Sequence, residues 1–136
     1  MTALRRLAVR ISQVVVRLAS PGAKDWAKAT AREVELIRPD WFFLGACGAD
    51  ADAGITAFDF DEGAFKRRVA AVSKAVLVAA TIDKLGTAAP YLVLPSRRLS
   101  HLVIEHDADA AQAEAFAALG VQVLRAPAAA IAKVPA

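Results

Sequence analysis

A lysine with two polar neighbours directly after an apolar run is the first feature of this chain that could bind a ligand. The apolar run covers Val76 to Ala79, and Thr81, Asp83 and Lys84 follow it. An ammonium group just beyond a buried strand is a natural counter-charge for a phosphate group. Lys84 is therefore the leading candidate for binding an anion, and an ordinary surface lysine in a loop is an equally open interpretation.

An acidic and a basic residue four positions apart form a second candidate pair. Glu62 and Lys66 fall on one predicted helix, where this spacing allows an ion pair worth about 0.3 kcal/mol. Asp59 and Glu62 are three positions apart, which matches a capping box at the start of that helix. Structural roles are therefore favoured over ligand binding, and the run from Lys66 to Arg68 is expected to form a solvated helix face.

Two glycines, Gly45 and Gly48, follow the apolar run Trp41–Leu44. Gly45 and Gly48 have no side chains, so the backbone there can approach a ligand closely and present its amides to phosphate or carboxylate oxygens. Taken alone, the two glycines are better explained as residues that turn the chain out of a strand.

The remaining polar residues do not form a recognisable catalytic or metal site. Gly54 lies among aspartates, but counting from Asp50 places Ile55 where a calcium-binding EF-hand loop requires glycine. His101 and His106 are too few for a zinc site and have no cysteine near them in sequence. The sequence predicts no metal, no cofactor and no catalytic residue.

The elements that position these residues alternate between strands and helices. Trp41 to Leu44 is an apolar run typical of a strand buried on both faces, and a long loop and a helix after Asp59 lead to a second strand at residues 75–80. A helix begins at Ser20-Pro21 and stops at Pro39. Further expected elements are strands at residues 9–18, 91–94, 101–105 and 121–124, and a helix at 108–119 that is ended by Gly120.

This alternation predicts an α/β fold with a mostly parallel, Rossmann-like sheet flanked by helices. Ligands of such sheets bind at the carboxyl ends of the strands. The loops that follow residues 46 and 80 are therefore expected to contain the site.

Composition and charge set the class of protein. The chain has 136 residues, which suits one domain, and no apolar run is long enough to span a membrane. Residues 1–38 hold eight basic and three acidic residues, a net charge of +5, but no helix-turn-helix pattern. The single cysteine, Cys47, has no base beside it and is expected to fill space in the core. No secretory signal is recognisable, so a cytoplasmic location is expected.

Four short motifs occur in a defined order along the chain. They are FLGACG ending at Gly48, DAGIT ending at Thr56, an acidic-led helix with Glu62 and Lys66, and TIDKLG ending at Gly86. This order resembles the effector-sensing domain of DeoR-type bacterial transcriptional regulators. The similarity continues more weakly through residues 101–125.

The resemblance implies a fold similar to that of sugar-phosphate isomerases and deaminases. It also implies that a ligand is bound by Gly45, Gly48, Glu62, Lys66, Thr81, Asp83 and Lys84. One departure concerns the family motif D-x-S-K. Here Thr81 replaces the leading acid of the motif and Asp83 occupies the serine position. The carboxylate has therefore moved two residues along, or its role in holding a sugar hydroxyl is lost.

The resemblance further implies a phosphorylated sugar or related small metabolite as ligand, a homo-oligomer, no membrane, and contact with DNA only through a helix-turn-helix domain. Neither that domain nor the family's glycine- and threonine-rich phosphate turn is recognisable. We therefore expect a truncated or standalone sensor, with an uncertain segment at residues 1–20, a partial sensing domain at 21–126 and a flexible tail at 127–136. Two alternatives are a remnant of a sugar-phosphate isomerase or deaminase, in which Glu62 and Asp83 are the acid–base candidates, and an oligomerisation module.

Overall fold

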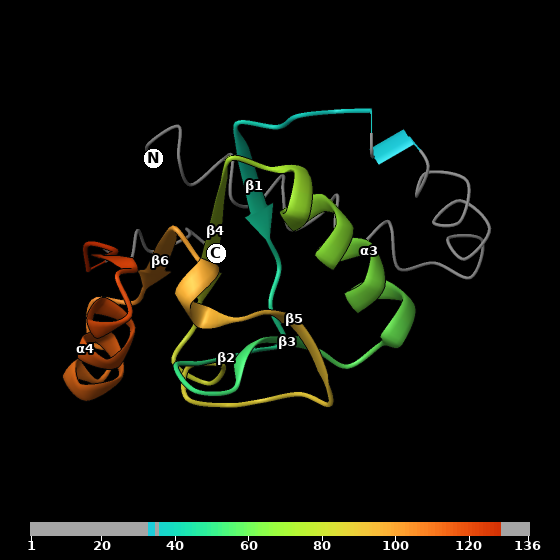
Figure 1. The fold of residues 1–136 in the computed structure, drawn as a ribbon. Helices are drawn as coiled ribbons and strands as arrows, with labels where there is room; N and C mark the ends of the chain where they lie inside the picture. The colour runs from blue at the N-terminus through green and yellow to red at the C-terminus, as the bar shows by residue number, and fades with distance from the viewer. Residues whose placement is uncertain (1–32, 35, 129–136) are drawn as a thin grey trace, which may run out of the picture.

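A four-stranded parallel sheet forms the centre of the structure. The computed structural model describes residues 33, 34 and 36–128. The sheet has the strand order β1-β4-β6-β7, and all neighbouring strands are parallel (Figure 1). Its strands are β1 (Trp41–Leu44), β4 (Ala75–Ala80), β6 (His101–Ile104) and β7 (Gln122–Arg125). The predicted α/β fold with a mostly parallel sheet is confirmed.

Helix α3 (Phe60–Val72) connects the first two of these strands and begins at the predicted cap. The Asp59 carboxylate accepts a hydrogen bond from the Glu62 amide at 2.9 Å, which satisfies one of the free amides of the first turn. In a full capping box the Glu62 carboxylate would also accept a hydrogen bond from the Asp59 amide, but here this carboxylate pairs with Lys66 instead. Along its length α3 packs against β1, β3 and β5.

The cap predicts a measurable loss of stability on substitution. Asp59→Ala is expected to lower the free energy of unfolding by about 1 kcal/mol, since the Glu62 amide loses its acceptor. Asp61→Ala is the matched control, because Asp61 is an exposed acid in the same helical turn without a capping bond. Urea unfolding of both variants tests this, and an equal effect of the two substitutions would contradict the assignment of the cap.

A second sheet replaces the long loop that the sequence predicts after β1. Strands β2 (Gly48–Asp50), β3 (Gly54–Ala57) and β5 (Tyr91–Leu94) pair antiparallel in the order β2-β3-β5. The turn between β2 and β3 is closed by Asp50, whose carboxylate accepts hydrogen bonds from the amides of Asp52 and Ala53. The prediction of a plain loop was therefore wrong, because a three-residue strand is too short to show a periodic pattern.

The last part of the described chain follows the prediction closely. Helix α4 (Ala110–Ala118) ends at Gly120, whose φ of 85° suits glycine, and the Val121 amide reaches back to the Phe116 carbonyl at 3.3 Å. The Phe116 side chain is fully buried in the core. Between β5 and β6 lies a short 3-10 helix, η1 (Ser96–Arg98).

The core lies on one face of the parallel sheet. Leu44, Val78 and Leu102 point into it, while Trp41 and Phe43 on the alternate positions of β1 are exposed. The expectation that β1 is buried on both faces was therefore wrong. The reason is topological: β1 is an edge strand among the described residues, and α3 packs on only one side of it.

Several predicted segments fall wholly or partly outside the described residues. These are the strand at residues 9–18, the segment at 1–20 and most of the tail at 127–136. Of the helix predicted up to Pro39, Glu33 and Val34 are helical. Within the part of the chain that the structure describes, no helix is long and apolar enough to cross a bilayer.

Candidate functional site

Four of the predicted residues, Gly45, Thr81, Asp83 and Lys84, lie at the carboxyl edge of the parallel sheet. Gly45 directly follows β1, the segment Thr81–Lys84 follows β4, and Glu105 follows β6. Since β4 lies between β1 and β6, the Thr81–Lys84 segment occupies the middle of this edge. This is the place where open α/β sheets bind their ligands.

The backbone around Lys84 is held rigidly. The amides of Lys84 and Leu85 both donate to the Thr81 carbonyl, at 3.0 and 3.1 Å, and close a tight turn. The Lys84 carbonyl in turn accepts from the Ala49 amide at 3.0 Å and from the Thr87 hydroxyl at 2.8 Å. A side chain on so constrained a backbone can be presented to a ligand at little entropic cost.

Glu105 anchors the same turn from the neighbouring strand. Its carboxylate accepts a hydrogen bond from the Ile82 amide at 2.6 Å. Sequence reasoning missed this residue. The signal that could have identified it is its position, because Glu105 is the first acidic residue after a strand that pairs with β4. The sequence alone did not show that these two strands are neighbours.

The side chain of Lys84 supplies a cation at this edge. It is half-buried, and it forms no hydrogen bond or ion pair with any residue of the described ranges. Thr81 and Asp83 are exposed on the same turn. An ammonium group without an acidic partner beside a rigid turn can accept an anionic group of a ligand.

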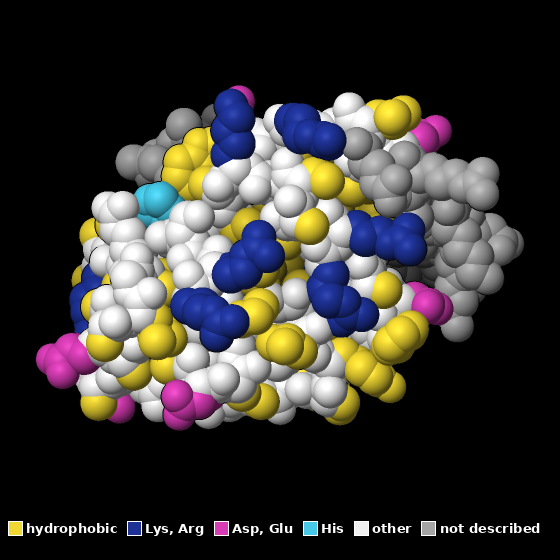
Figure 2. Space-filling view, in the orientation of Figure 1, with side chains coloured by type: hydrophobic (Ala, Val, Ile, Leu, Met, Phe, Trp, Pro, Cys, Tyr) yellow, Lys and Arg dark blue, Asp and Glu magenta, His cyan; other side chains and the backbone are white. Residues whose placement is uncertain are grey.

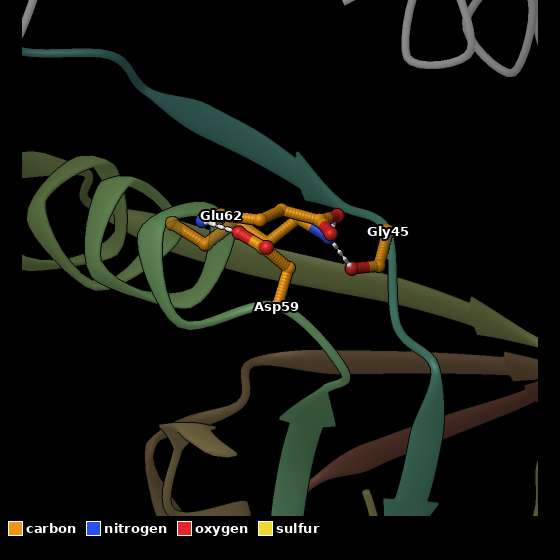
Figure 3. A network of polar contacts seen from close by, with 4 residues as sticks. Gly45, Asp59 and Glu62 are labelled. Carbon is orange, nitrogen blue, oxygen red and sulfur yellow. Dashed lines mark hydrogen bonds and ion pairs between the residues drawn. The ribbon is translucent and has the colours of Figure 1, made fainter. Parts of the chain in front are cut away.

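Lys66 belongs to a separate network at the amino end of α3 (Figure 3). Its ammonium group donates to the Gly45 carbonyl at 2.7 Å and forms an ion pair with Glu62. The side chain of Lys66 is only 10% exposed, whereas that of Glu62 is 41% exposed. The predicted ion pair is confirmed, but the prediction that Lys66 lies on a solvated helix face was wrong, since Gly45 draws the ammonium group inward.

This network fixes the exit of β1 against α3. Lys66 and Gly45 are 21 residues apart, so their hydrogen bond joins the strand end to the second turn of the helix. The first turn of α3 is acidic, with Asp61 and Glu62 beside the cap. These carboxylates disfavour an anion at the amino end of the helix, where the helix dipole alone would attract one.

Gly48 has a packing role. It lies buried in β2, where an added Cβ would stand 2.5 Å from the Thr87 carbonyl oxygen and 2.8 Å from the Thr56 hydroxyl oxygen. The amides on either side are occupied, because Cys47 donates to the Thr56 carbonyl and Ala49 to that of Lys84. The expectation that amides of this segment are free for a ligand is therefore wrong at these two positions.

Thr56, the last residue of the DAGIT motif, links three segments of the chain. Its buried hydroxyl donates to the Gly48 carbonyl at 3.3 Å and accepts from the Ala89 amide at 2.8 Å. The hydroxyl therefore ties the β2–β3 hairpin to the segment that precedes β5. The Thr in this motif has a structural explanation that does not require contact with a ligand.

Other polar and titratable residues of the described ranges do not form a second cluster of this kind. Among the described residues, no group of three or more His, Cys, Asp and Glu side chains could hold a metal ion. His101 packs against the Trp41 ring at 4.9 Å, and the half-buried Cys47 packs against the core. The carboxyl edge is therefore the best-supported candidate for a ligand site.

Comparison with known proteins agrees with this architecture. The family model described as the DeoR C terminal sensor domain matches residues 26–106. This match covers more than half of the chain and includes every element from β1 to β6. No curated protein matches the chain significantly. The chain belongs to the family of DeoR C-terminal sensor domains.

Proposed function

We propose that this sensor domain binds a phosphorylated sugar or a related phosphorylated metabolite at the carboxyl edge of its parallel sheet. The observation that carries the proposal is the half-buried Lys84, whose ammonium group has no partner among the described residues and whose backbone is fixed on both sides. The domain would act in the cytoplasm as part of a homo-oligomeric regulator. A separate helix-turn-helix domain would bind the operator DNA.

The proposed roles of the residues follow from their partners. Lys84 would bind the phosphate group. Glu62 is partly exposed and pairs with Lys66 through one carboxylate oxygen, so its other oxygen could accept a hydrogen bond from a sugar hydroxyl. Lys66 would position Gly45 and Glu62 without touching the ligand. Asp83 would take over the role of the leading acid of the family motif, which stands two residues earlier, at the position of Thr81.

Regulation would come from a shift between two conformations. A ligand changes such an equilibrium only if it binds one conformation more tightly than the other. The Thr81–Lys84 turn is bonded to β2 through the Lys84 carbonyl and to the end of β6 through Glu105, so a ligand held by this turn would be coupled to both sheets. A change in their relative position would then be transmitted to the rest of the regulator.

Catalysis is not part of the proposal. Turnover of a sugar phosphate needs an acid or base positioned over the substrate. Glu62 is engaged with Lys66, and Asp83 is exposed. Isomerase or deaminase turnover that is abolished by Glu62→Gln or Asp83→Asn would overturn this assignment and favour the alternative of an enzyme.

The test is ligand-dependent stabilisation of the full chain against a panel of pentose and hexose phosphates, the matching unphosphorylated sugars and inorganic phosphate. A phosphorylated ligand at a hundredfold excess over its Kd is expected to stabilise the fold by about 2.7 kcal/mol. Lys84→Ala is expected to weaken binding by about tenfold, and Lys74→Ala is the control because Lys74 is paired with Asp40 on the surface. Equal binding of unphosphorylated sugars, or unchanged binding by Lys84→Ala, would contradict the proposal.

A further inference from the structure

One side of α3 is an exposed stripe of alternating charge and small residues. Gly63, Lys66, Val69 and Ala70 point into the protein, whereas Asp61, Arg68 and Ala71 are exposed and Ala64 is half-buried. Asp61, Ala64, Arg68 and Ala71 are spaced three or four residues apart, so they share one side of the helix. We call Asp61, Ala64, Arg68 and Ala71 the α3 stripe.

Two residues of the stripe, Asp61 and Arg68, are charged. Within the described part of the chain, neither Asp61 nor Arg68 forms an ion pair or hydrogen bond through its side chain. They are seven residues apart, about 10 Å along the helix axis, which is too far for a direct contact with each other. The stripe therefore has an acidic end and a basic end, with the small side chain of Ala64 between them.

An exposed apolar cluster adjoins the acidic end of the stripe. This cluster comprises four residues with exposed fractions between 38% and 69%, namely Phe58, Phe60, Tyr91 and Leu92. The rings of Phe60 and Tyr91 meet edge to face at 5.6 Å, and the Arg67 guanidinium lies 5.9 Å from the Phe60 ring centre. Arg67 also donates to the Leu92 carbonyl of the edge strand β5. Ordered Phe, Tyr and Arg side chains of this kind are typical of the centres of protein interfaces.

We propose that a second copy of this chain packs on the α3 stripe, with the two α3 helices antiparallel about a two-fold axis near Ala64. A two-fold interface brings the same patch of both copies together, so each pairing of residues occurs twice. In this arrangement Asp61 of each copy faces Arg68 of the other. Ala64 at the crossing allows the two helices to approach closely, and Phe60 packs over Ala71 of the second copy.

The charges decide the direction of this packing. In a parallel arrangement Asp61 would meet Asp61 and Arg68 would meet Arg68, and such like-charge contacts are costly at an interface. The antiparallel arrangement forms two attractive pairs instead. On the face of the molecule shown in Figure 2, apolar side chains are interspersed with Lys and Arg side chains. This face is therefore not uniformly charged.

A charge swap tests the pairing. Sedimentation equilibrium of the full chain is expected to show a dimer whose dissociation constant rises about a hundredfold in Asp61→Arg and in Arg68→Asp. The double variant carrying both changes should restore the dimer, since each new charge again meets its opposite. Glu114→Arg on α4 is the control, because it reverses an exposed helical charge outside the stripe. A monomeric wild type, or single variants that dimerise like the control, would overturn the proposal.

A cysteine on the proposed axis gives an independent test. In a Cys47→Ser background, Ala64→Cys should form a disulfide-linked dimer on mild oxidation, while Ala115→Cys at an exposed position of α4 should not. Equal cross-linking at both positions would contradict the axis. Neither Asp61 nor Arg68 belongs to the proposed ligand site, so ligand binding by Asp61→Arg separates a failure of this inference from a failure of the proposed function.

Discussion

Lys66→Met is expected to lower the free energy of unfolding by about 2–3 kcal/mol. Methionine preserves most of the apolar stem, so the change removes mainly the ammonium group. That group donates to the Gly45 carbonyl at 2.7 Å and pairs with Glu62 in a largely buried position. Without it, the Gly45 carbonyl loses its charged donor and the Glu62 carboxylate loses its counter-ion. Urea unfolding of the variant measures the loss.

Lys74→Met is the matched control for this substitution. Lys74 also forms an ion pair, with Asp40 at 2.6 Å, but both side chains are about three-quarters exposed, at 74% and 73%. Water and salt screen such a pair, so the expected loss is below about 1 kcal/mol. Equal losses for the two variants would mean that the Gly45 contact adds nothing to the stability of the fold.

The Lys66→Met substitution also distinguishes a structural lysine from a ligand-binding lysine. Lys66→Met should lower stability whether or not a ligand is present, because its partners belong to the protein. Lys84→Ala should leave the stability of the free protein nearly unchanged and reduce only the stabilisation by ligand. The opposite pattern would transfer the ligand-binding role from Lys84 to Lys66.

Gly48→Ala is expected to lower the free energy of unfolding by about 3 kcal/mol, near the upper end for an overpacked site. The new methyl group would stand 2.5 Å from the Thr87 carbonyl oxygen, which is part of the backbone and cannot rotate away. It would also stand 2.8 Å from the Thr56 hydroxyl oxygen, which accepts a hydrogen bond from the Ala89 amide. Relief of either contact requires β2 or the Thr87 segment to move.

Gly120→Ala separates this steric effect from backbone strain. Gly120 has a φ of 85° but no atom within 4 Å of an added Cβ, so only the left-handed conformation is penalised, by about 1 kcal/mol. Thermal or urea unfolding of both variants compares the two costs. If Gly48→Ala were no less stable than Gly120→Ala but failed to respond to a sugar phosphate, Gly48 would have a ligand role in place of the packing role.

The sequence by itself determined the elements whose signals are local. The apolar runs of β1 and β4, the capped start of α3 at Asp59, and the end of α4 at Gly120 all agree with the structure. These features depend on residues close together in the chain, namely apolar continuity, a capping side chain and a glycine that adopts positive φ. The ordered motifs also led to the DeoR family, which the family match confirms.

Only the tertiary structure decided which residues meet. The burial of Lys66 depends on Gly45, 21 residues away, and the turn before Lys84 depends on Glu105, which directly follows the neighbouring strand β6. The second sheet depends on β5, which pairs with β3 across more than 30 residues of chain, and the strand order places β1 at an edge among the described strands. Such contacts depend on how strands are ordered in space, and a local pattern of residue types does not contain that information.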